Sequence, residues 1–249
     1  MESMDERVKR SDMENNATAL AVQLLKSCPI PYKQRFSNLG LFLNSRDLSR
    51  ILFMDYIYRQ IVDVQGAVFD FGTRWGHSMA IFSALRGIYE PFNRHRKIVG
   101  FDTFSGFPQV TEEDGKAELM QIGNLSVTAD YEKYLEQIME YHEQSNPLAH
   151  IKKYEIRKGD AAAEISHYLA DNPETIVALA YFDLDVYHST KACLEAIAPR
   201  LVKGAVLAFD ELNDHDAPGE TQALDEVFGL KNIRLKRFPH ASRVSYFVV

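Results

Sequence analysis

Four carboxylates directly follow two apolar runs in this 249-residue chain. Asp183 and Asp185 end one run, and Asp210 and Glu211 end the next. Runs rich in branched and aromatic residues are typical of parallel strands that helices cover on both faces. Such sheets bind ligands at the edge where their strands end. Four acids gathered there would repel one another unless a cation lay among them, so the pattern predicts a hard-metal site and an enzyme.

The two runs belong to a regular alternation of strands and helices that begins near Ala67. This alternation predicts an α/β domain built on a largely parallel sheet. The expected strands cover residues 67–71, 97–101, 154–158, 176–182, 205–209, 233–238 and 243–249. The expected helices cover residues 78–89, 128–142, 161–170 and 189–201. A short turn at Pro239 joins the last two strands, so they should form an antiparallel hairpin.

Two further helices are expected before the first strand, over residues 15–25 and 46–64. Pro29 and Pro31 prevent the first from continuing, because proline lacks an amide donor. Residues 1–64 are therefore expected to form a helical cap or lid, and residues 65–249 the sheet domain. Hydrophobic patterning does not separate a lid from a subunit contact, so a homo-oligomer formed through these helices is also an expectation.

The overall composition argues against several classes of partner. The chain has 28 Lys and Arg against 35 Asp and Glu, and a net charge of −7 does not favour nucleic acid or a membrane surface. The first ten residues lack the apolar core of a secretory signal, and no run approaches the roughly 18 apolar residues of a membrane span. Two cysteines without metal-ligand spacing are typical of reduced thiols. These features predict a cytoplasmic protein.

A glycine-containing turn follows the first expected strand. Gly72 and Gly76 stand between that strand and the next helix, where backbone amides at a helix start favour anionic groups. The spacing matches neither the GxGxxG pattern of dinucleotide-binding folds nor a P-loop. A tight strand-to-helix connection without a ligand would have a similar sequence, so both interpretations stay open.

Acidic residues also end the second and third expected strands. Asp102 is placed to accept hydrogen bonds from two ribose hydroxyls, as in doubly wound nucleoside-binding folds, or to cap a turn. Asp160 is placed to accept a hydrogen bond from an adenine amine or to cap the following helix. The strand ends therefore predict a nucleoside-shaped ligand.

In combination these features resemble the class I S-adenosylmethionine-dependent methyltransferases. More narrowly, the chain resembles the macrocin O-methyltransferase family, which methylates sugar hydroxyls on macrolides and related natural products. The resemblance covers about residues 67–249, and its most specific segments are 102–108, 182–190 and 199–211. It implies a Rossmann-like, mostly parallel seven-stranded sheet with helices on both faces and an antiparallel last strand.

The resemblance also implies cofactors and residue roles. S-adenosyl-L-methionine would be the methyl donor, and Mg²⁺ would be bound by Asp183, Asp210 and Glu211, although the family usually has a second Asp at the last position. Asp185 would be the catalytic base that deprotonates the acceptor. The implied cofactor-binding residues are Gly72, Thr73, Trp75, Gly76, Ser78, Asp102, Thr103, Phe104, Asp160, Ala161 and Asp183.

The sequence thus predicts a magnesium-dependent O-methyltransferase that acts on a sugar, a glycosylated natural product or a polysaccharide precursor. One alternative is a methyltransferase for a catechol or another small vicinal diol, and a second is a nucleoside-binding protein without catalysis. His77, His188 and His215 lie in the same loops and are alternative bases. The polar segment 213–221 is expected to border the acceptor site.

Overall fold

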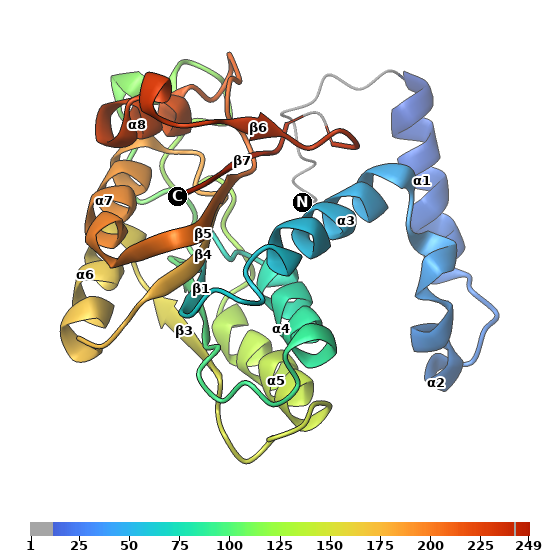
Figure 1. Cartoon of the computed structure of the whole chain (residues 1–249). Coiled ribbons are helices and arrows are strands. Elements are labelled where there is room, and N and C mark those ends of the chain that lie inside the picture. Colours follow the sequence, from blue (N-terminus) through green and yellow to red (C-terminus); the bar gives the residue numbers. More distant parts are fainter. Residues whose placement is uncertain (1–11, 242) are drawn as a thin grey trace. The chain divides into compact units, whose positions relative to one another are not determined.

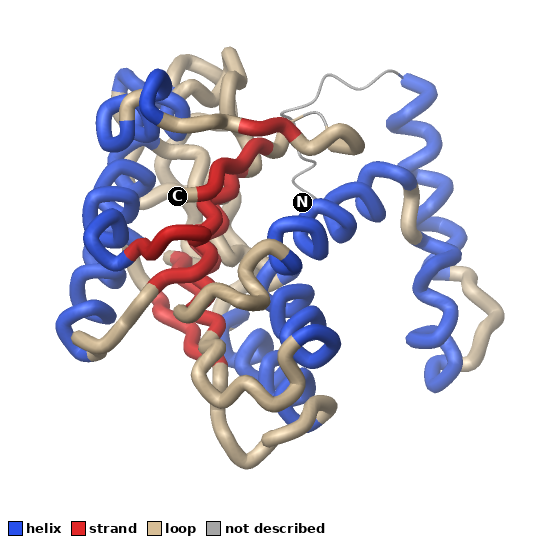
Figure 2. The backbone as a smooth tube through the Cα atoms, in the orientation of Figure 1, coloured by secondary structure: helices blue, strands red, loops and turns tan. Residues whose placement is uncertain are grey.

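The computed structural model describes residues 12–241 and 243–249. The chain forms two compact units, and the boundary lies between Ile51 and Leu52. The N-terminal unit is helical (Figure 2). Its elements are α1 (Asp12–Lys26), α2 (Tyr32–Arg35), the 3-10 helix η1 (Phe36–Phe42) and the first part of α3 (Ser45–Arg59). Both helices expected before the first strand are therefore present, and α3 ends at Arg59 rather than at residue 64.

The second unit contains a seven-stranded sheet in the order β3-β2-β1-β4-β5-β7-β6. Its strands are β1 (Ala67–Phe71), β2 (Ile98–Asp102), β3 (Tyr154–Lys158), β4 (Val177–Phe182), β5 (Leu201–Phe209), β6 (Lys236–Arg237) and β7 (Ser245–Val248). The first five strands are parallel, and β7 runs antiparallel to both β5 and β6. The predicted Rossmann-like sheet with its antiparallel last strand is confirmed. Chain order reverses between β1 and β4, where such sheets bind ligands.

Helices cover both faces of this sheet (Figure 1). The core on one face includes α4 (His77–Tyr89), α5 (Tyr131–Gln144) and the second part of α3, and the core on the other includes α6 (Ala161–Asp171), α7 (Tyr187–Ile197) and α8 (Gly219–Phe228). Neighbouring strand residues alternate between the two cores, as Val68 and Phe69 do. This explains why the strands are uninterrupted apolar runs.

Several elements differ from the sequence prediction, among them β6, which covers Lys236–Arg237 rather than residues 233–238. Helix α7 ends at Ile197 instead of continuing to residue 201, because Pro199 occupies the 3-10 helix η3 (Ala198–Arg200) and has no amide to donate. Strand β5 then begins at Leu201. Helix α8 was not predicted at all, since its first residues fall in the polar segment assigned to a loop.

No helix in the described part of the chain is long and apolar enough to span a membrane.

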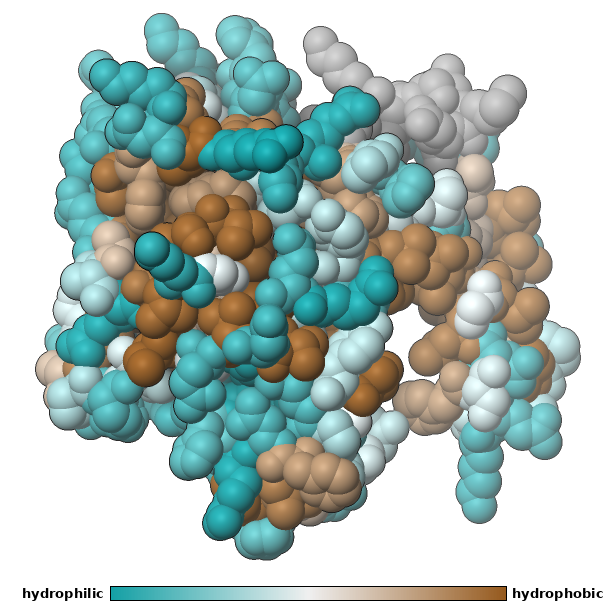
Figure 3. Space-filling view, in the orientation of Figure 1, coloured by the Kyte–Doolittle hydropathy of each residue, from teal (hydrophilic) through white to brown (hydrophobic). Residues whose placement is uncertain are grey.

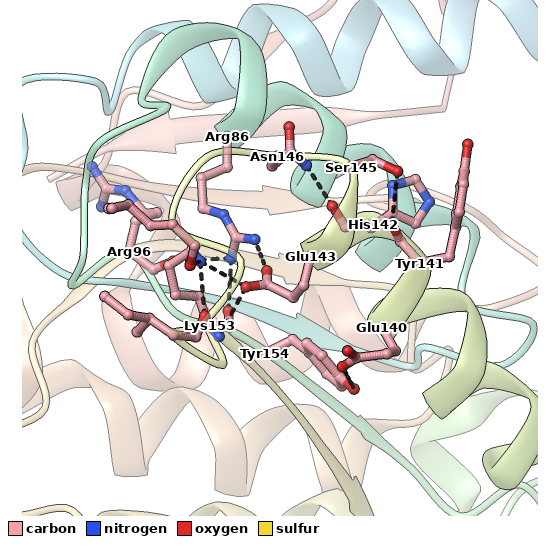
Figure 4. Close-up of polar contacts among 12 residues, drawn as sticks. Arg86, Arg96, Glu140, Tyr141, His142, Glu143, Ser145, Asn146, Lys153 and Tyr154 are labelled. Carbon is pink, nitrogen blue, oxygen red and sulfur yellow. Dashed lines mark hydrogen bonds and ion pairs between the residues drawn. The ribbon is translucent and has the colours of Figure 1, made fainter.

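A buried charge network fixes α4 and α5 against the start of β3 (Figure 4). Glu143 pairs with Arg86, and its Oε2 accepts from the Lys153 ammonium at 2.7 Å. Arg86 also donates to the Lys153 carbonyl at 2.8 Å. All three side chains are at most 3% exposed. Burial and the charge of Arg86 lower the pKa of Lys153 to about 8, so Glu143 is needed to balance two desolvated cations.

Replacing Glu143 by alanine should therefore destabilise the sheet unit. The change leaves Arg86 and Lys153 without their shared carboxylate, and removing one partner of a buried pair costs about 3–5 kcal/mol. Urea denaturation measures the loss. Asp130→Asn on the same helix is the control, because the Asp130–Lys133 pair is exposed and should leave the midpoint unchanged. Equal midpoints for the two variants would contradict a structural role of the network.

Candidate active site

The glycine turn packs closely against the end of β4. Gly72 has a φ of +84°, and a β-carbon there would lie 1.9 Å from the carbonyl oxygen of Asp183. Gly76 precedes α4 with a φ of +77°, and a β-carbon there would meet Leu135 at 2.2 Å. No side chain caps the start of α4, so its first amides face the same edge as the strand ends. Packing thus requires glycine at both positions, and the backbone at this turn is also suited to binding a ligand.

An aromatic group lies beside this turn. Trp75 is 44% exposed, and its ring meets the Tyr131 ring edge-on at 4.7 Å between centroids. The Tyr131 hydroxyl donates to the Trp75 carbonyl at 3.0 Å, and Tyr134 packs on Tyr131. These rings give the turn an apolar border at the surface.

Asp70 is a buried acid that sequence analysis did not assign to the site. It lies within β1 and is fully buried. Burial raises its pKa to about 7, and the charges of Asp183 and Asp102 add to this effect, while the hydroxyls of Ser78 and Thr73 oppose it. A single acid inside an otherwise apolar strand was the available signal. Three carboxylates therefore converge at the ends of β1, β2 and β4.

Asp102 is held rigidly at the end of β2. Its Oδ2 accepts from the Arg74 amide at 2.8 Å, and its Oδ1 accepts from the Phe104 amide at 2.6 Å. Burial raises its pKa. The loop that follows is closed by Thr103, whose hydroxyl donates to the Gly106 carbonyl at 2.6 Å. A carboxylate has about four acceptor positions, so this anchored group can still accept from ligand hydroxyls.

Asp160 caps helix α6, which was one of the two roles expected for it. Its Oδ1 accepts from the Ala162 amide at 3.1 Å and from the Ser189 hydroxyl at 3.1 Å. The neighbouring Ala161 is buried in the core beneath α6. The Asp160 side chain is thus fixed at the third strand end.

A second group of acids surrounds the ends of β4 and β5. Asp185 is 2% exposed, and Asp210 is 8% exposed and accepts from the Tyr181 hydroxyl at 2.9 Å. Glu220 from α8 is fully buried beside them. Burial raises the pKa of Glu220 to about 8, with further contributions from Asp185, Asp183 and Asp210. Glu220 was missed because α8 was not predicted.

Glu211 is oriented differently from its neighbour in sequence. It is fully buried and ion-paired with Arg243, which also contacts Asp214 at 2.9 Å. Within residues 12–241 and 243–249, no set of three or more His, Cys, Asp and Glu side chains is arranged as a metal site. The oxygen donors of Asp183 and Asp210 still have the chemistry that Mg²⁺ prefers.

A cavity of about 760 Å³ opens beside this acidic group. It is formed by segments 115–117 and 213–222, and Gln222 joins the two by donating to the Glu113 carbonyl at 3.1 Å. Its charged and polar lining includes Lys116, Asn213 and His215. The three candidate histidines are all exposed, and of them His215 lines this cavity.

Comparison with known structures decides the family. The crystal structure of CalS11, a calicheamicin methyltransferase, matches with a TM-score of 0.95 and 41% identity over 100% of this chain and 98% of that chain. This chain belongs to the class I S-adenosylmethionine-dependent sugar O-methyltransferases. An apo structure of CalS11, described as a TDP-rhamnose 3'-O-methyltransferase, matches with a TM-score of 0.86 and 39% identity over 97% and 96%.

More distant structures share the fold of this methyltransferase. The O-methyltransferase NovP matches with a TM-score of 0.59 and 18% identity over 80% of this chain and 78% of that chain. No family model matches, and no curated protein sequence matches either. The assignment to an enzyme family therefore comes from the full-length structural match at 41% identity.

The raised pKa of Asp70 predicts a pH-dependent stability of the ligand-free enzyme. Between pH 3.8 and about 7 the unfolded state has released this proton and the native state retains it, so stability falls as pH rises. Above pH 7 the native state is destabilised by the full free-energy cost of ionising the buried Asp70, on the order of 4 kcal/mol. Asp70→Asn should therefore melt higher than wild type at pH 8, with a smaller advantage at pH 5.

Thermal melting at pH 5, 6, 7 and 8 measures this difference. Glu220 titrates in both proteins, so the difference between them reports Asp70 together with its coupling to Asp102 and Asp183. An advantage of Asp70→Asn that stays constant with pH, or that grows towards pH 5, would contradict the proposed ionisation.

Proposed function

We propose that this enzyme transfers the methyl group of S-adenosylmethionine to a hydroxyl of a sugar, with a TDP-linked deoxysugar as the first acceptor to test. The observation that carries this proposal is the match over the whole chain to CalS11, whose described substrate is TDP-rhamnose. The cavity beside the strand ends supports it, because its lining includes side chains that can hydrogen-bond to sugar hydroxyls, among them Lys116, Asn213 and Gln222.

The proposed donor site lies at the ends of β1, β2 and β4. S-adenosylmethionine supplies the methyl group from a positively charged sulfonium and also carries an ammonium group. The buried carboxylate of Asp70 and the partly buried carboxylates of Asp102 and Asp183 provide negative charge at that edge, and the charges of Asp183 and Asp102 add to the effect of burial on the pKa of Asp70. Asp102 would accept from the ribose hydroxyls, and Asp160 would lie near the adenine.

The proposed catalytic step is an in-line displacement, for which donor and acceptor must be closely aligned. Asp185 would accept the proton of the sugar hydroxyl, because it lies at the end of β4 between the proposed donor site and the cavity-forming segment at Glu220. It is 2% exposed, so water competes little for its carboxylate. The alternative base among the loop histidines is His215, which lines the cavity.

We infer that Asp183 and Asp210 would be the first ligands of Mg²⁺ at this site. Both are oxygen donors at adjacent strand ends, and they repel Glu220, so the local charge favours a cation. When bound, the ion would lower the pKa of the acceptor hydroxyl. Glu211 would have to leave its ion pair with Arg243 to join them.

The N-terminal helices are proposed as a lid or as a contact between copies of the enzyme. None of the side chains of residues 15–51 is buried. Leu24, Phe36 and Leu41 are 55%, 75% and 69% exposed, and apolar side chains of this unit are visible in Figure 3. Short helices of this kind need packing to be stable, so this apolar surface suits either role.

The acceptor proposal is tested by incubating the enzyme with S-adenosylmethionine and TDP-rhamnose and measuring product mass. The expected result is a gain of one methyl group on the TDP-sugar, with no methylation of catechol. The free sugar, without the nucleotide, is the matched comparison. Methylation of catechol with no turnover of any TDP-deoxysugar would overturn the sugar assignment.

Metal dependence is tested in the same assay with excess EDTA and with Mg²⁺ restored. We expect EDTA to abolish turnover and Mg²⁺ to recover it, because the acceptor hydroxyl is a poor nucleophile without the ion. Asp183→Asn should lose turnover while keeping the wild-type melting temperature. Full activity in excess EDTA would contradict the metal proposal and leave the methyl-transfer proposal intact.

A further inference from the structure

The loop that carries Asp185 is held by buried carboxylates from two distant parts of the chain. On one side, Oε1 of Glu220 accepts from the Leu184 amide at 3.0 Å and from the Asp185 amide at 3.3 Å. Glu220 is fully buried at the start of α8. One carboxylate oxygen therefore fixes two consecutive backbone amides at the proposed base.

On the other side, Asp114 fixes the backbone amide of Tyr187, two residues after Asp185. The Oδ1 atom of Asp114 accepts from this amide. Its Oδ2 accepts from the Thr111 amide at 2.7 Å, which closes a capping box around the 3-10 helix η2 (Glu112–Asp114). Asp114 is also fully buried. The loop thus donates hydrogen bonds to two acids that are 106 positions apart in sequence, Asp114 and Glu220.

Gly219 lets these two acids approach the same loop. A β-carbon at Gly219 would lie 2.5 Å from Oδ1 of Asp114 and 2.7 Å from the Tyr187 amide nitrogen. It would also lie 3.2 Å from the Asp185 carbonyl oxygen. The start of α8 is therefore wedged between the η2 segment and the catalytic loop, with no room for a side chain.

The conformation of Asp185 explains why such support is needed. Asp185 has a φ of +64°, in the left-handed region that residues with a β-carbon seldom adopt. Such a conformation is strained and persists only when the surroundings fix it. The hydrogen bonds that the Asp185 amide donates to Glu220 and the Tyr187 amide donates to Asp114 supply that constraint.

We propose that Asp114 and Glu220 are positioning residues that hold the Asp185 loop in its left-handed conformation and join it to the walls of the acceptor cavity. Asp114 directly precedes the cavity segment 115–117, and Glu220 lies between Pro218 and Thr221, which line the cavity. The cavity walls and the proposed base therefore form one hydrogen-bonded assembly. This inference rests on the proposed methyl transfer, in which Asp185 must be aligned with the acceptor.

The test compares two substitutions of Glu220 in the full-length enzyme. Glu220→Gln keeps a carbonyl oxygen that can accept from both amides, whereas Glu220→Ala removes it. We expect kcat with S-adenosylmethionine and TDP-rhamnose to fall at least about 100-fold in the alanine variant, since small misalignments cost that much. The glutamine variant should keep most of the wild-type kcat. Glu226→Gln, on the same helix but bonded to the Lys191 and Tyr187 side chains, is the control and should retain wild-type kcat.

Hydrogen exchange provides a readout that needs no acceptor. The amides of Leu184 and Asp185 should exchange faster in Glu220→Ala than in wild type, and slowly in Glu220→Gln, while affinity for S-adenosylmethionine stays within about 2-fold. If the Glu220→Ala variant does not fold, Asp114→Ala and Gly219→Ala should lower kcat in the same way. Wild-type kcat and unchanged exchange in folded variants would overturn the positioning role. Absence of turnover by wild type on any sugar would instead count against the proposed function, and the exchange result would still decide whether the loop is held.

Discussion

Repulsion among carboxylates at one edge of the sheet is the constraint around which the site is built. Five parallel strands end at this edge, and each has a buried or partly buried acid near its end, either within the strand or shortly after it. Burial, with a further contribution from their mutual charge, raises the pKa values of Asp70, Asp102 and Glu220. A protein keeps such an arrangement at a cost in stability, and cationic ligands relieve it. A positively charged methyl donor and a divalent ion both meet that requirement.

The acids are not equivalent, because the backbone uses some of them as anchors. Asp102 accepts from the Arg74 amide in the glycine turn, Asp160 accepts from the Ala162 amide at the start of α6, and Glu220 accepts from the amides of the Asp185 loop. Each of these contacts fixes a strand end that would otherwise be free to move under charge repulsion. Some carboxylates of the site are therefore backbone anchors, whereas Asp183 and Asp185 are the ones proposed to bind the metal ion and to accept the acceptor proton.

Sequence reasoning succeeded where an element is defined by its own residues. Most of the β strands are apolar because both faces are covered, so their positions in the chain and the acids that follow them could be predicted. Sequence reasoning failed where tertiary packing determines the local structure. The start of α8 has the composition of a turn, and its helical face is carried by Ala223, Leu224 and Val227, so Glu220 was not placed at the site. The ion pair of Glu211 with Arg243 joins segments 32 residues apart, a contact that no local pattern indicates.

The central claim is that this acidic edge binds the methyl donor while Asp185 faces the acceptor. A crystal structure with S-adenosylhomocysteine and TDP-rhamnose tests it most directly. The account predicts the ribose hydroxyls within hydrogen-bond distance of the Asp102 carboxylate, and one rhamnose hydroxyl within hydrogen-bond distance of Asp185. A nucleoside bound away from the ends of β1, β2 and β4, or a sugar with no hydroxyl near Asp185, would contradict it.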